Sequence, residues 1–325
     1  MKHDSALHSV PPTTPTTDLY FAWSMAQDIA CGRVERLAPT VYRTETHLLV
    51  CRAGTVPAGA AAGRKLVYLI DDDVSAGIAS NEVPWAYRLK LAVTERPQMA
   101  ELVRQASLIV TSSPVLMSRL TARYPSCNIA CLPPSWPMVP PRGDEVDGDG
   151  PLEVALLMGM SHRRNVQPIY ADLRDLLAKA DVRLTLSANL APPFDLTRDP
   201  RVSVLPVLGW GDYLGALAGR RFDLMLYPMP GDCAFNMARS DSKLGEAAAV
   251  NAALVAQAGW ATRLGLSAAD RIFEIGAEGW LAGLLRIVGD RPAIASVAAR
   301  NRQFLQAEDR SALQRRFWLR ELGLQ

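Results

Sequence analysis

The sequence has few cysteines and no long apolar run. Its five cysteines are scattered over 325 residues, and only Cys127 and Cys131 are near neighbours in the chain. An odd number of dispersed thiols, without a histidine or a second cysteine pair close by, argues against a disulfide framework and against a zinc site. Reduced thiols in the cytoplasm are the simpler interpretation. A helix that spans a bilayer needs about 20 predominantly apolar residues, and the sequence contains no such run.

The first 18 residues lack the apolar core of a secretory signal and are rich in Ser, Thr and Pro. This composition predicts a flexible tail. Membrane contact is therefore expected at most at the surface, and the candidate for it is the C-terminal helix over residues 306–325, where Phe317 and Trp318 stand among arginines. The alternative interpretation is that this helix packs its two rings back on the first domain.

The sequence also lacks a strong excess of charge. It has 35 basic and 33 acidic residues, a formal net charge of +2, which is too small to indicate a nucleic-acid partner. Any anion must therefore be bound by a local group of cations. With 49% apolar and 21% charged residues, the chain is typical of a globular protein. Its length exceeds what one ordinary core holds and predicts about two domains.

Short apolar runs alternate with segments of helical spacing along the whole chain. Strands are expected at residues 47–52, 65–70, 106–113, 128–132, 152–157, 182–187, 202–206, 222–227 and 253–256. Continuous apolar strands of this kind favour parallel sheets covered by helices. The pattern predicts an α/β protein with two Rossmann-like, doubly wound domains that face a cleft, in which ligands bind beyond the carboxyl ends of the strands.

The predicted domain limits follow from a change of composition. Residues 136–150 are rich in Pro, Gly and Asp and are expected to form a linker. The first domain then covers residues 19–135 and looks reduced, and the second covers residues 151–305.

The most informative stretch runs from Phe235 to Ala249, directly after the strand expected at 222–227. A polar loop leads into an Ala-rich helix whose first turns carry hydroxyls, a lysine and a glutamate. The free N–H groups of a helix start favour phosphate, and a lysine adds a mobile cation. The alternative is a capped surface helix that binds nothing, with Ser240 or Asp241 as the N-cap. The residues predicted to bind a ligand here are Phe235, Asn236, Ser240, Ser242, Lys243 and Glu246.

A second candidate segment follows the strand expected at 152–157. Gly159 would let a backbone approach a ligand closely, and Arg163 and Arg164 have side chains well shaped for phosphate oxygens. His162 is a candidate catalytic residue, since histidine serves as a general base near neutral pH. The alternative for the whole segment is a solvated basic turn.

Three consecutive aspartates, Asp71, Asp72 and Asp73, follow the strand expected at 65–70. Carboxylates in such a position can hold a magnesium ion. We prefer a role for one of them, Asp72, as a catalytic base or acceptor ligand, because adjacent residues at a strand end point in alternating directions. Capping of a helix near Val74 is the alternative.

Together, these segments resemble those of a known family, the GT-B glycosyltransferases, especially bacterial enzymes of the family 4 kind. The segments that carry the resemblance are residues 66–73, 106–113 with 132–134, 158–165 and 235–246. The resemblance implies that Gly159, Arg163 and Arg164 contact the diphosphate of a nucleotide sugar, with Ser242 and Lys243, and that Glu246 contacts its ribose. It also implies that no bound metal is needed and that the anomeric configuration is retained.

The chain departs from the family pattern at one position of the site. The family often has two glutamates eight positions apart, and Ala238 stands where the first of them would precede Glu246. Contacts to the sugar ring therefore lack one expected acid.

The expected function is that of a metal-independent, hexosyltransferase-like enzyme without a cofactor. It would move a sugar from a nucleotide diphosphate donor to a hydroxyl of a saccharide, lipid-linked or protein acceptor, in cell-surface polysaccharide or glycoconjugate synthesis. The expected location is the cytoplasm or the inner face of the membrane. Two alternatives remain, a non-catalytic GT-B-like binding or assembly protein and a nucleotide-sugar epimerase.

Overall fold

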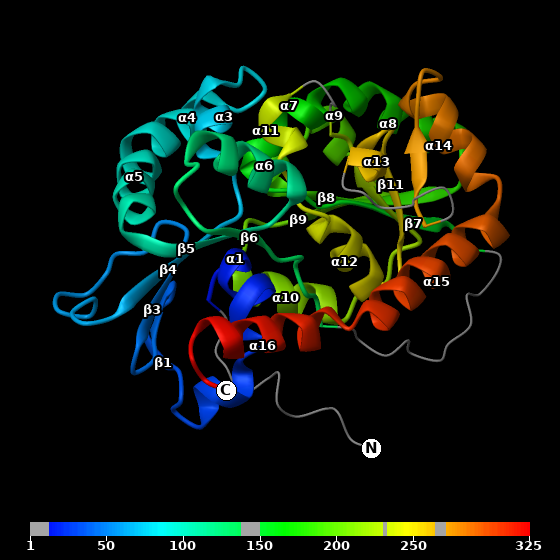
Figure 1. Ribbon diagram of the computed structural model, residues 1–325. Helices are drawn as coiled ribbons and strands as arrows, with labels where there is room; N and C mark the ends of the chain where they lie inside the picture. The colour runs from blue at the N-terminus through cyan, green and yellow to red at the C-terminus, as the bar shows by residue number, and fades with distance from the viewer. Residues whose placement is uncertain (1–12, 138–149, 230–232, 264–270) are drawn as a thin grey trace.

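The computed structural model describes residues 13–137, 150–229, 233–263 and 271–325. These residues form two six-stranded sheets with helices packed on them, one sheet in each half of the chain (Figure 1). The prediction of an α/β protein with two Rossmann-like units is therefore confirmed.

The first sheet combines a parallel part with an antiparallel extension. Its strands lie in sequential order, and β3 to β6 are parallel, whereas β1, β2 and β3 pair antiparallel. The sequence did not indicate β1 and β2, because these strands are short and carry charged residues instead of an apolar run. The bounds are β1 Glu35–Ala38, β2 Val41–Arg43, β3 His47–Cys51, β4 Lys65–Ile70, β5 Ala106–Thr111 and β6 Ile129–Cys131.

The two faces of the first sheet are covered by different parts of the chain. Sequential strand order with right-handed crossovers places the connecting helices on one face. There Leu48, Val50 and Tyr68 pack against residues of α3, η2 and α5. The other face, with Leu49 and Val67, is covered by the two ends of the described chain. The bounds are α3 Val74–Ala79, α4 Trp85–Lys90, η2 Leu91–Glu95, α5 Arg96–Gln105, α6 Pro114–Arg123, α1 Pro15–Thr17, η1 Asp18–Ala22, α2 Ala26–Ala30 and α16 Arg310–Glu321.

Part of the predicted flexible tail is helical, since α1 and the start of η1 cover residues 15–18, of which Thr16, Thr17 and Asp18 are buried. The Thr14 side chain accepts a hydrogen bond from the Thr17 amide, and Pro15 occupies the first helical turn, where proline is well tolerated. Asp18 is buried and accepts from Trp210 Nε1 at 2.8 Å. These caps and long-range contacts outweigh the polar composition, and the rest of the predicted tail, residues 1–12, lies outside the described residues.

The C-terminal helix α16 crosses back to the first sheet (Figure 1). Trp318 is fully buried, lies edge-on to Phe21 at 5.2 Å and donates from Nε1 to the Tyr20 carbonyl at 2.6 Å. Its ring is therefore used for packing and is not available to a membrane. None of the helices in the described part of the chain is long and apolar enough to cross a bilayer.

The second sheet is entirely parallel, with the strand order β12-β11-β10-β7-β8-β9. The direction of winding reverses between β7 and β10, and ligands bind at such a switch point in open α/β sheets. The bounds are β7 Leu152–Leu156, β8 Val182–Ser187, β9 Val202–Leu205, β10 Leu224–Tyr227, β11 Ala253–Gln257 and β12 Phe273–Ile275. The helices are η3 Met160–His162, α7 Arg163–Val166, η4 Gln167–Ile169, α8 Tyr170–Lys179, η5 Ala188–Leu190, α9 Phe194–Thr197, α10 Trp210–Ala218, α11 Ala234–Met237, α12 Ser242–Ala249, α13 Trp260–Arg263, α14 Trp280–Val288 and α15 Arg291–Glu308.

The segment between β10 and α12 is docked on the first domain at several points. The carbonyls of Ala234 and Ala238 accept from Arg119 Nη1 at 2.6 Å and from Ser113 Oγ at 2.7 Å. Ser240 Oγ accepts from the hydroxyl of Tyr20 at 2.8 Å. These contacts fix the segment predicted to bind a ligand against the first domain.

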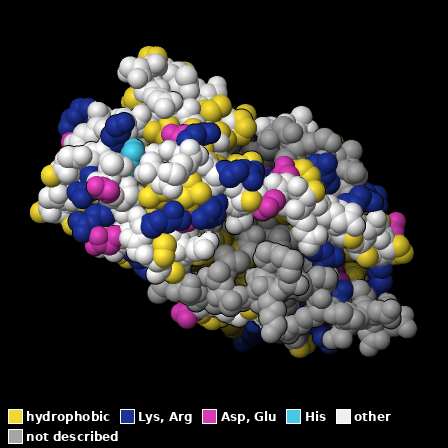
Figure 2. All heavy atoms as spheres, turned by 60° about the horizontal axis from the view of Figure 1, so that its bottom comes forward, with side chains coloured by type: hydrophobic (Ala, Val, Ile, Leu, Met, Phe, Trp, Pro, Cys, Tyr) yellow, Lys and Arg dark blue, Asp and Glu magenta, His cyan; other side chains and the backbone are white. Residues whose placement is uncertain are grey.

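Figure 2 shows the face on which α16 lies. Lys and Arg side chains on this face alternate with acidic, apolar and neutral ones. This face therefore shows no large patch of basic side chains among the described residues.

Candidate functional site

A cavity of about 820 Å³ lies between the two sheets. The first domain lines it with Arg52, Asp71 and Glu95, among others, and the second with the backbone at the end of β7 and the start of α12. Its place at the winding switch of the second sheet is where an α/β fold binds ligands.

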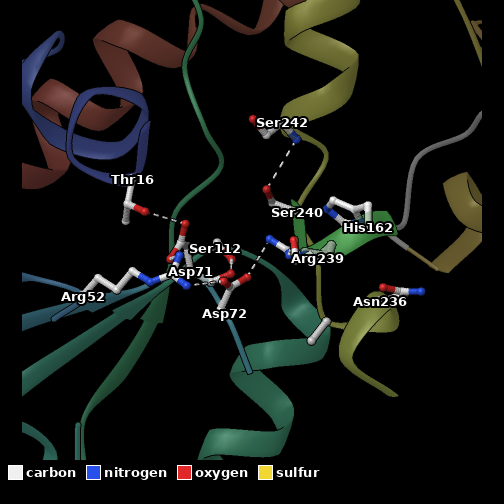
Figure 3. A network of polar contacts seen from close by, with 12 residues as sticks. Thr16, Arg52, Asp71, Asp72, Ser112, His162, Asn236, Arg239, Ser240 and Ser242 are labelled. Atoms are coloured by element: carbon white, nitrogen blue, oxygen red, sulfur yellow. Dashed lines mark hydrogen bonds and ion pairs between the residues drawn. The ribbon is translucent and has the colours of Figure 1, made fainter. Parts of the chain in front are cut away.

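The start of α12 is buried in this cavity, and it is not a capped surface helix. Asp241, at the N-cap position, makes no cap hydrogen bond, because its carboxylate pairs with Arg310 at 2.6 Å. Ser242 Oγ accepts from Trp136 Nε1 at 3.1 Å, and Ser240 Oγ lies 3.4 Å from the Ser242 amide (Figure 3). Both serines line the cavity.

Lys243 and Glu246 form a buried ion pair at the cavity wall. Lys243 Nζ lies 2.6 Å from Glu246 Oε2 and donates to the Leu157 carbonyl at 2.7 Å. Their side chains are only 11% and 8% exposed, so neither is a solvated surface group. An ammonium has three donors, and these two contacts leave Lys243 one N–H for a ligand. The other oxygen of Glu246, Oε1, accepts from the hydroxyl of Tyr213.

A steric detail explains why a glycine precedes Glu246 in this helix. A Cβ added to Gly245 would lie 2.3 Å from Cδ1 of Trp136. The indole therefore packs directly on the backbone of α12, and it carries the hydrogen bond to Ser242. Sequence patterns gave no sign of this contact, since Trp136 falls in the stretch predicted to be a linker.

Gly159 lies at the cavity edge, after β7. Its φ of −74° is open to any residue, and an added Cβ would meet no protein atom within 4 Å. Nothing in the fold requires glycine here, so the open space beside it is available to a ligand.

The two arginines of the same segment lie away from the cavity. Arg163 Nε donates to the Asn189 carbonyl at 2.6 Å, and the exposed Arg164 donates to the carbonyl of Asn81 in the first domain. Neither lines the cavity. The diphosphate contact expected for them is not part of this arrangement.

Phe235 and Asn236 are buried beside the cavity without lining it. Phe235 packs with Val83 and Cys233. Asn236 exchanges two hydrogen bonds, each of 3.3 Å, with the amide of Asn165. Both side chains therefore pack behind the cavity wall and do not contact the cavity itself.

The three consecutive aspartates turn to different partners. Asp72 is almost fully buried, and its carboxylate lies 2.7 Å from both Arg52 Nη2 and Arg239 Nη1 (Figure 3). Burial alone would raise the pKa of Asp72, but the two guanidiniums outweigh it and hold that pKa below its usual value. A carboxylate so stabilised in its charged form is a poor proton acceptor, which argues against Asp72 as the catalytic base.

Asp71 is the carboxylate of this trio that lines the cavity. Its Oδ2 accepts from Thr16 Oγ1 at 2.6 Å, and its Oδ1 lies 3.4 Å from Arg52 Nη1. Burial raises the pKa of Asp71 despite this arginine, so it binds a proton more readily than Asp72. Asp73 caps α3 through the Ala76 amide, as the capping alternative predicted.

Arg239 is the cavity cation that the sequence analysis missed. It pairs with Asp72, lies over the Phe235 ring at 4.5 Å, and reaches Ser161 Oγ with Nη2 at 3.3 Å. Its Nε is buried and has no hydrogen-bond partner among the described residues. The sequence feature that could have indicated Arg239 is its position four residues before Lys243, close to the start of α12.

Arg52, the partner of Asp72 in the first domain, was also missed. It follows β3 with a φ of 54°, a left-handed conformation that costs energy for a non-glycine residue. Contacts with Asp71, Asp72 and Glu95 hold the guanidinium in place. The apolar run that predicted this strand gave no indication of the turn.

Ala238, at the position of the absent glutamate, is buried in the core of the first domain. A longer acidic side chain would have to enter that core or displace it. The neighbouring Arg239 fills the adjacent part of the cavity instead.

His162 lines the cavity from η3. Burial, together with the nearby cations Arg239 and Lys243, lowers the pKa of His162 well below its ordinary value. The ring is therefore neutral at pH 7.

In the part of the chain that the structure describes, no three His, Cys, Asp or Glu side chains are grouped so that they could hold a metal ion.

The architecture is similar to that of several solved glycosyltransferase structures. Sucrose-phosphate synthase from Thermosynechococcus elongatus matches with a TM-score of 0.56 at 12% identity, over 81% of this chain and 69% of that one. TarM matches with 0.55 at 9% identity, over 80% and 50% of the two chains. HepE of Anabaena, in complex with UDP and glucose, matches with 0.52 at 16% identity, over 80% and 72%.

No protein-family model and no curated protein matches the chain. At identities of 9–16% the likeness establishes the fold. The chain therefore has the GT-B fold of these glycosyltransferases.

Proposed function

We propose that this protein transfers a sugar from a nucleoside diphosphate sugar to a hydroxyl acceptor, without a bound metal ion and with retention of the anomeric configuration. The observation that carries the proposal is the convergence of Arg239 and Lys243, from the start of α12, on the cavity between the two domains. Lys243 has one N–H left for a ligand, and Arg239 lines the same cavity. Two such cations stabilise the charge of a departing diphosphate.

The chemistry follows from this arrangement. The bond between the anomeric carbon and the diphosphate oxygen breaks, and the acceptor oxygen bonds to the same carbon. The acceptor proton passes to the leaving group or to Asp71, the cavity carboxylate whose pKa is raised. Retention is a proposal that rests on the family resemblance alone.

Glu246 would hold the ribose after a change of partners. Both of its oxygens are bonded, to Lys243 and to Tyr213, so a ribose hydroxyl must displace one of these. We propose polysaccharide or glycoconjugate synthesis, beside the inner face of a membrane, as the setting, and residues 19–135 and 151–305 as the two domains.

Thermal stability with added UDP, GDP, CDP, ADP or TDP is the first test. A ligand at about a hundred times its dissociation constant adds about 2.7 kcal/mol to the free energy of unfolding. We expect one diphosphate to stabilise the wild type by this amount and Lys243→Ala by about 1.4 kcal/mol, because a tenfold loss of affinity leaves the ligand at about ten times its dissociation constant. Arg174→Ala, which replaces an exposed arginine on α8, should keep the full effect. Stabilisation by none of the five would contradict the proposal and favour a non-catalytic binding or assembly protein.

Product analysis then separates the enzyme classes. With the stabilising nucleotide as its sugar conjugate, a transferase forms product only when an acceptor is present. Conversion of the donor without an acceptor would instead favour an epimerase.

A further inference from the structure

The Nδ1 edge of the His162 ring contacts the first of two buried asparagine amides that are hydrogen-bonded to each other. His162 Nδ1 lies 3.2 Å from Asn165 Nδ2. Asn165 Nδ2 also lies 3.3 Å from Asn236 Oδ1, and Asn236 Nδ2 lies 3.3 Å from Asn165 Oδ1. All three side chains are less than a tenth exposed. The ring is thus fixed by a chain of contacts that runs from the end of β7 to α11.

A sulfur atom decides which way the Asn165 amide faces. Asn165 Nδ2 lies 3.4 Å from Met229 Sδ, and a thioether can only accept a hydrogen bond. The NH₂ group, and not the carbonyl oxygen, must therefore face Met229 and the neighbouring His162 Nδ1. The two hydrogens of this NH₂ group are shared among His162 Nδ1, Met229 Sδ and Asn236 Oδ1. Since an amide nitrogen has no lone pair to offer, a proton on Nδ1 would face another donor, so the proton of the neutral ring resides on Nε2.

The protonated nitrogen is left for a ligand. His162 lines the cavity, and its Nε2 has no hydrogen-bond partner among the described residues. The charged groups that act on the ring are Arg239, Lys243 and Asp72, and burial with the two cations keeps the ring neutral. Figure 3 shows His162 beside Ser240, on the same side of the site as Arg239.

We propose that His162 donates a hydrogen bond from Nε2 to a phosphate oxygen of the nucleotide donor, and that Asn165 and Asn236 are positioning residues that fix its tautomer. The inference rests on the function proposed above. It assigns His162 a role other than that of a general base, because the only lone pair of the neutral ring, on Nδ1, is already taken by Asn165.

Nitrogen NMR of histidine-labelled protein tests the tautomer without any ligand. The chain has four histidines, and His162→Gln identifies the signal of interest. We expect the Nε2–H tautomer in the wild type. In Asn165→Asp, the carboxylate can only accept a hydrogen bond, which favours a proton on Nδ1, so the signal should change to a ring protonated on Nδ1. An Nδ1–H tautomer in the wild type would overturn the inference.

Binding of the nucleoside diphosphate that stabilises the wild type tests the contact. Loss of a hydrogen bond to a charged phosphate should weaken affinity about tenfold in His162→Ala, which has no side-chain donor, and in Asn165→Asp. Asn236→Ala should weaken it less and give a mixture of tautomers, and Gln167→Ala, an exposed neighbour, should change neither signal nor affinity.

The outcomes separate this inference from the proposed function. Unchanged affinity in His162→Ala, with a wild type that binds a diphosphate, would overturn the phosphate contact and leave the proposed function standing. Failure of the wild type to bind any of the five diphosphates would overturn both the proposed function and the contact, while the NMR signal would still decide the tautomer.

Discussion

Two segments of the second domain each carry a pair of cations but differ in what they contribute to the cavity. Residues 159–165 follow β7 and residues 235–246 follow β10, and each carries two cations after a buried parallel strand. Arg239 and Lys243 of the later segment line the cavity, whereas Arg163 and Arg164 of the earlier one do not. A basic residue beyond a strand end is therefore only a candidate for phosphate binding.

The difference arises from the partners of each cation. Arg163 and Arg164 bind the backbone carbonyls of Asn189 and Asn81, and neither arginine lines the cavity. Arg239 is directed into it by Asp72 of the first domain, and Lys243 by the Leu157 carbonyl and Glu246. The later segment therefore needs a residue of the first domain to direct one of its cations. The geometry of this site depends on how the two domains contact each other.

Replacement of Arg239 should have the largest effect and would test the comparison most directly. Arg239→Gln should weaken diphosphate binding about a hundredfold, because a charged, partly unsatisfied donor is lost. It should also reduce the free energy of unfolding by about 3 kcal/mol, since the buried Asp72 keeps only Arg52 as a close partner. Calorimetric titration and urea unfolding measure the two effects.

A double variant separates these two contributions of Arg239. Adding Asp72→Asn removes the buried charge, so Arg239→Gln/Asp72→Asn should recover most of the lost stability while diphosphate binding stays weak. If the double variant binds as tightly as the wild type, Arg239 serves only to pair the aspartate, and the comparison between the segments fails.

Lys243→Ala and Glu246→Ala should each lower donor affinity or turnover by about tenfold, equivalent to about 1.4 kcal/mol. Lys243 is expected to contact phosphate and Glu246 the ribose. Steady-state kinetics with the natural donor, once identified, measures the effect, and the exposed Arg174→Ala is the matched control for loss of a cation. Wild-type rates in both variants would remove the two residues from the site.

Arg163→Ala and Arg164→Ala should change donor affinity by no more than about twofold, because substitutions outside a site usually cost less than about 0.5 kcal/mol. The same titration measures both. A tenfold loss in either variant would mean that the earlier segment rearranges to contact the donor. The two segments would then not differ in their contribution to donor binding.

The last expected effect concerns pH and stability. The pKa of His162 is lower in the folded protein than its ordinary value of 6.5, so the folded state resists protonation of the ring. Its contribution to stability is present above about pH 6.5 and is lost as the pH falls below that value. The fall in melting temperature between pH 8 and pH 5.5 should therefore be smaller in His162→Gln. An equal or larger fall in the variant would show that His162 is not kept neutral.

Much of the fold could be predicted from runs of apolar residues. Strands β4 and β8 have the bounds that the sequence indicated, Lys65–Ile70 and Val182–Ser187, because apolar residues recur along each of these runs and are buried in the sheet. Strands β1, β2 and β12 were missed. They have three or four residues each, and a segment this short has no periodicity to detect.

The candidate site was only partly predictable. The stretch from Phe235 to Glu246 contains two cavity cations, because a strand, a polar loop and a helix start follow one another in the sequence. The choice among Asp71, Asp72 and Asp73 was not predictable, since adjacent carboxylates point to different neighbours. Arg239 was overlooked because its role depends on Asp72, more than 160 positions earlier.

The sequence by itself determined the α/β class, the two sheets and the place of the main candidate stretch, because apolar spacing and helix-start residues act locally. The tertiary structure decided which polar groups face the cavity. It joined Asp72 to Arg239, turned Arg163 and Arg164 away, and placed the ends of the chain, with Trp318, on the first sheet. These choices depend on contacts between residues far apart in the chain, and no local pattern encodes them.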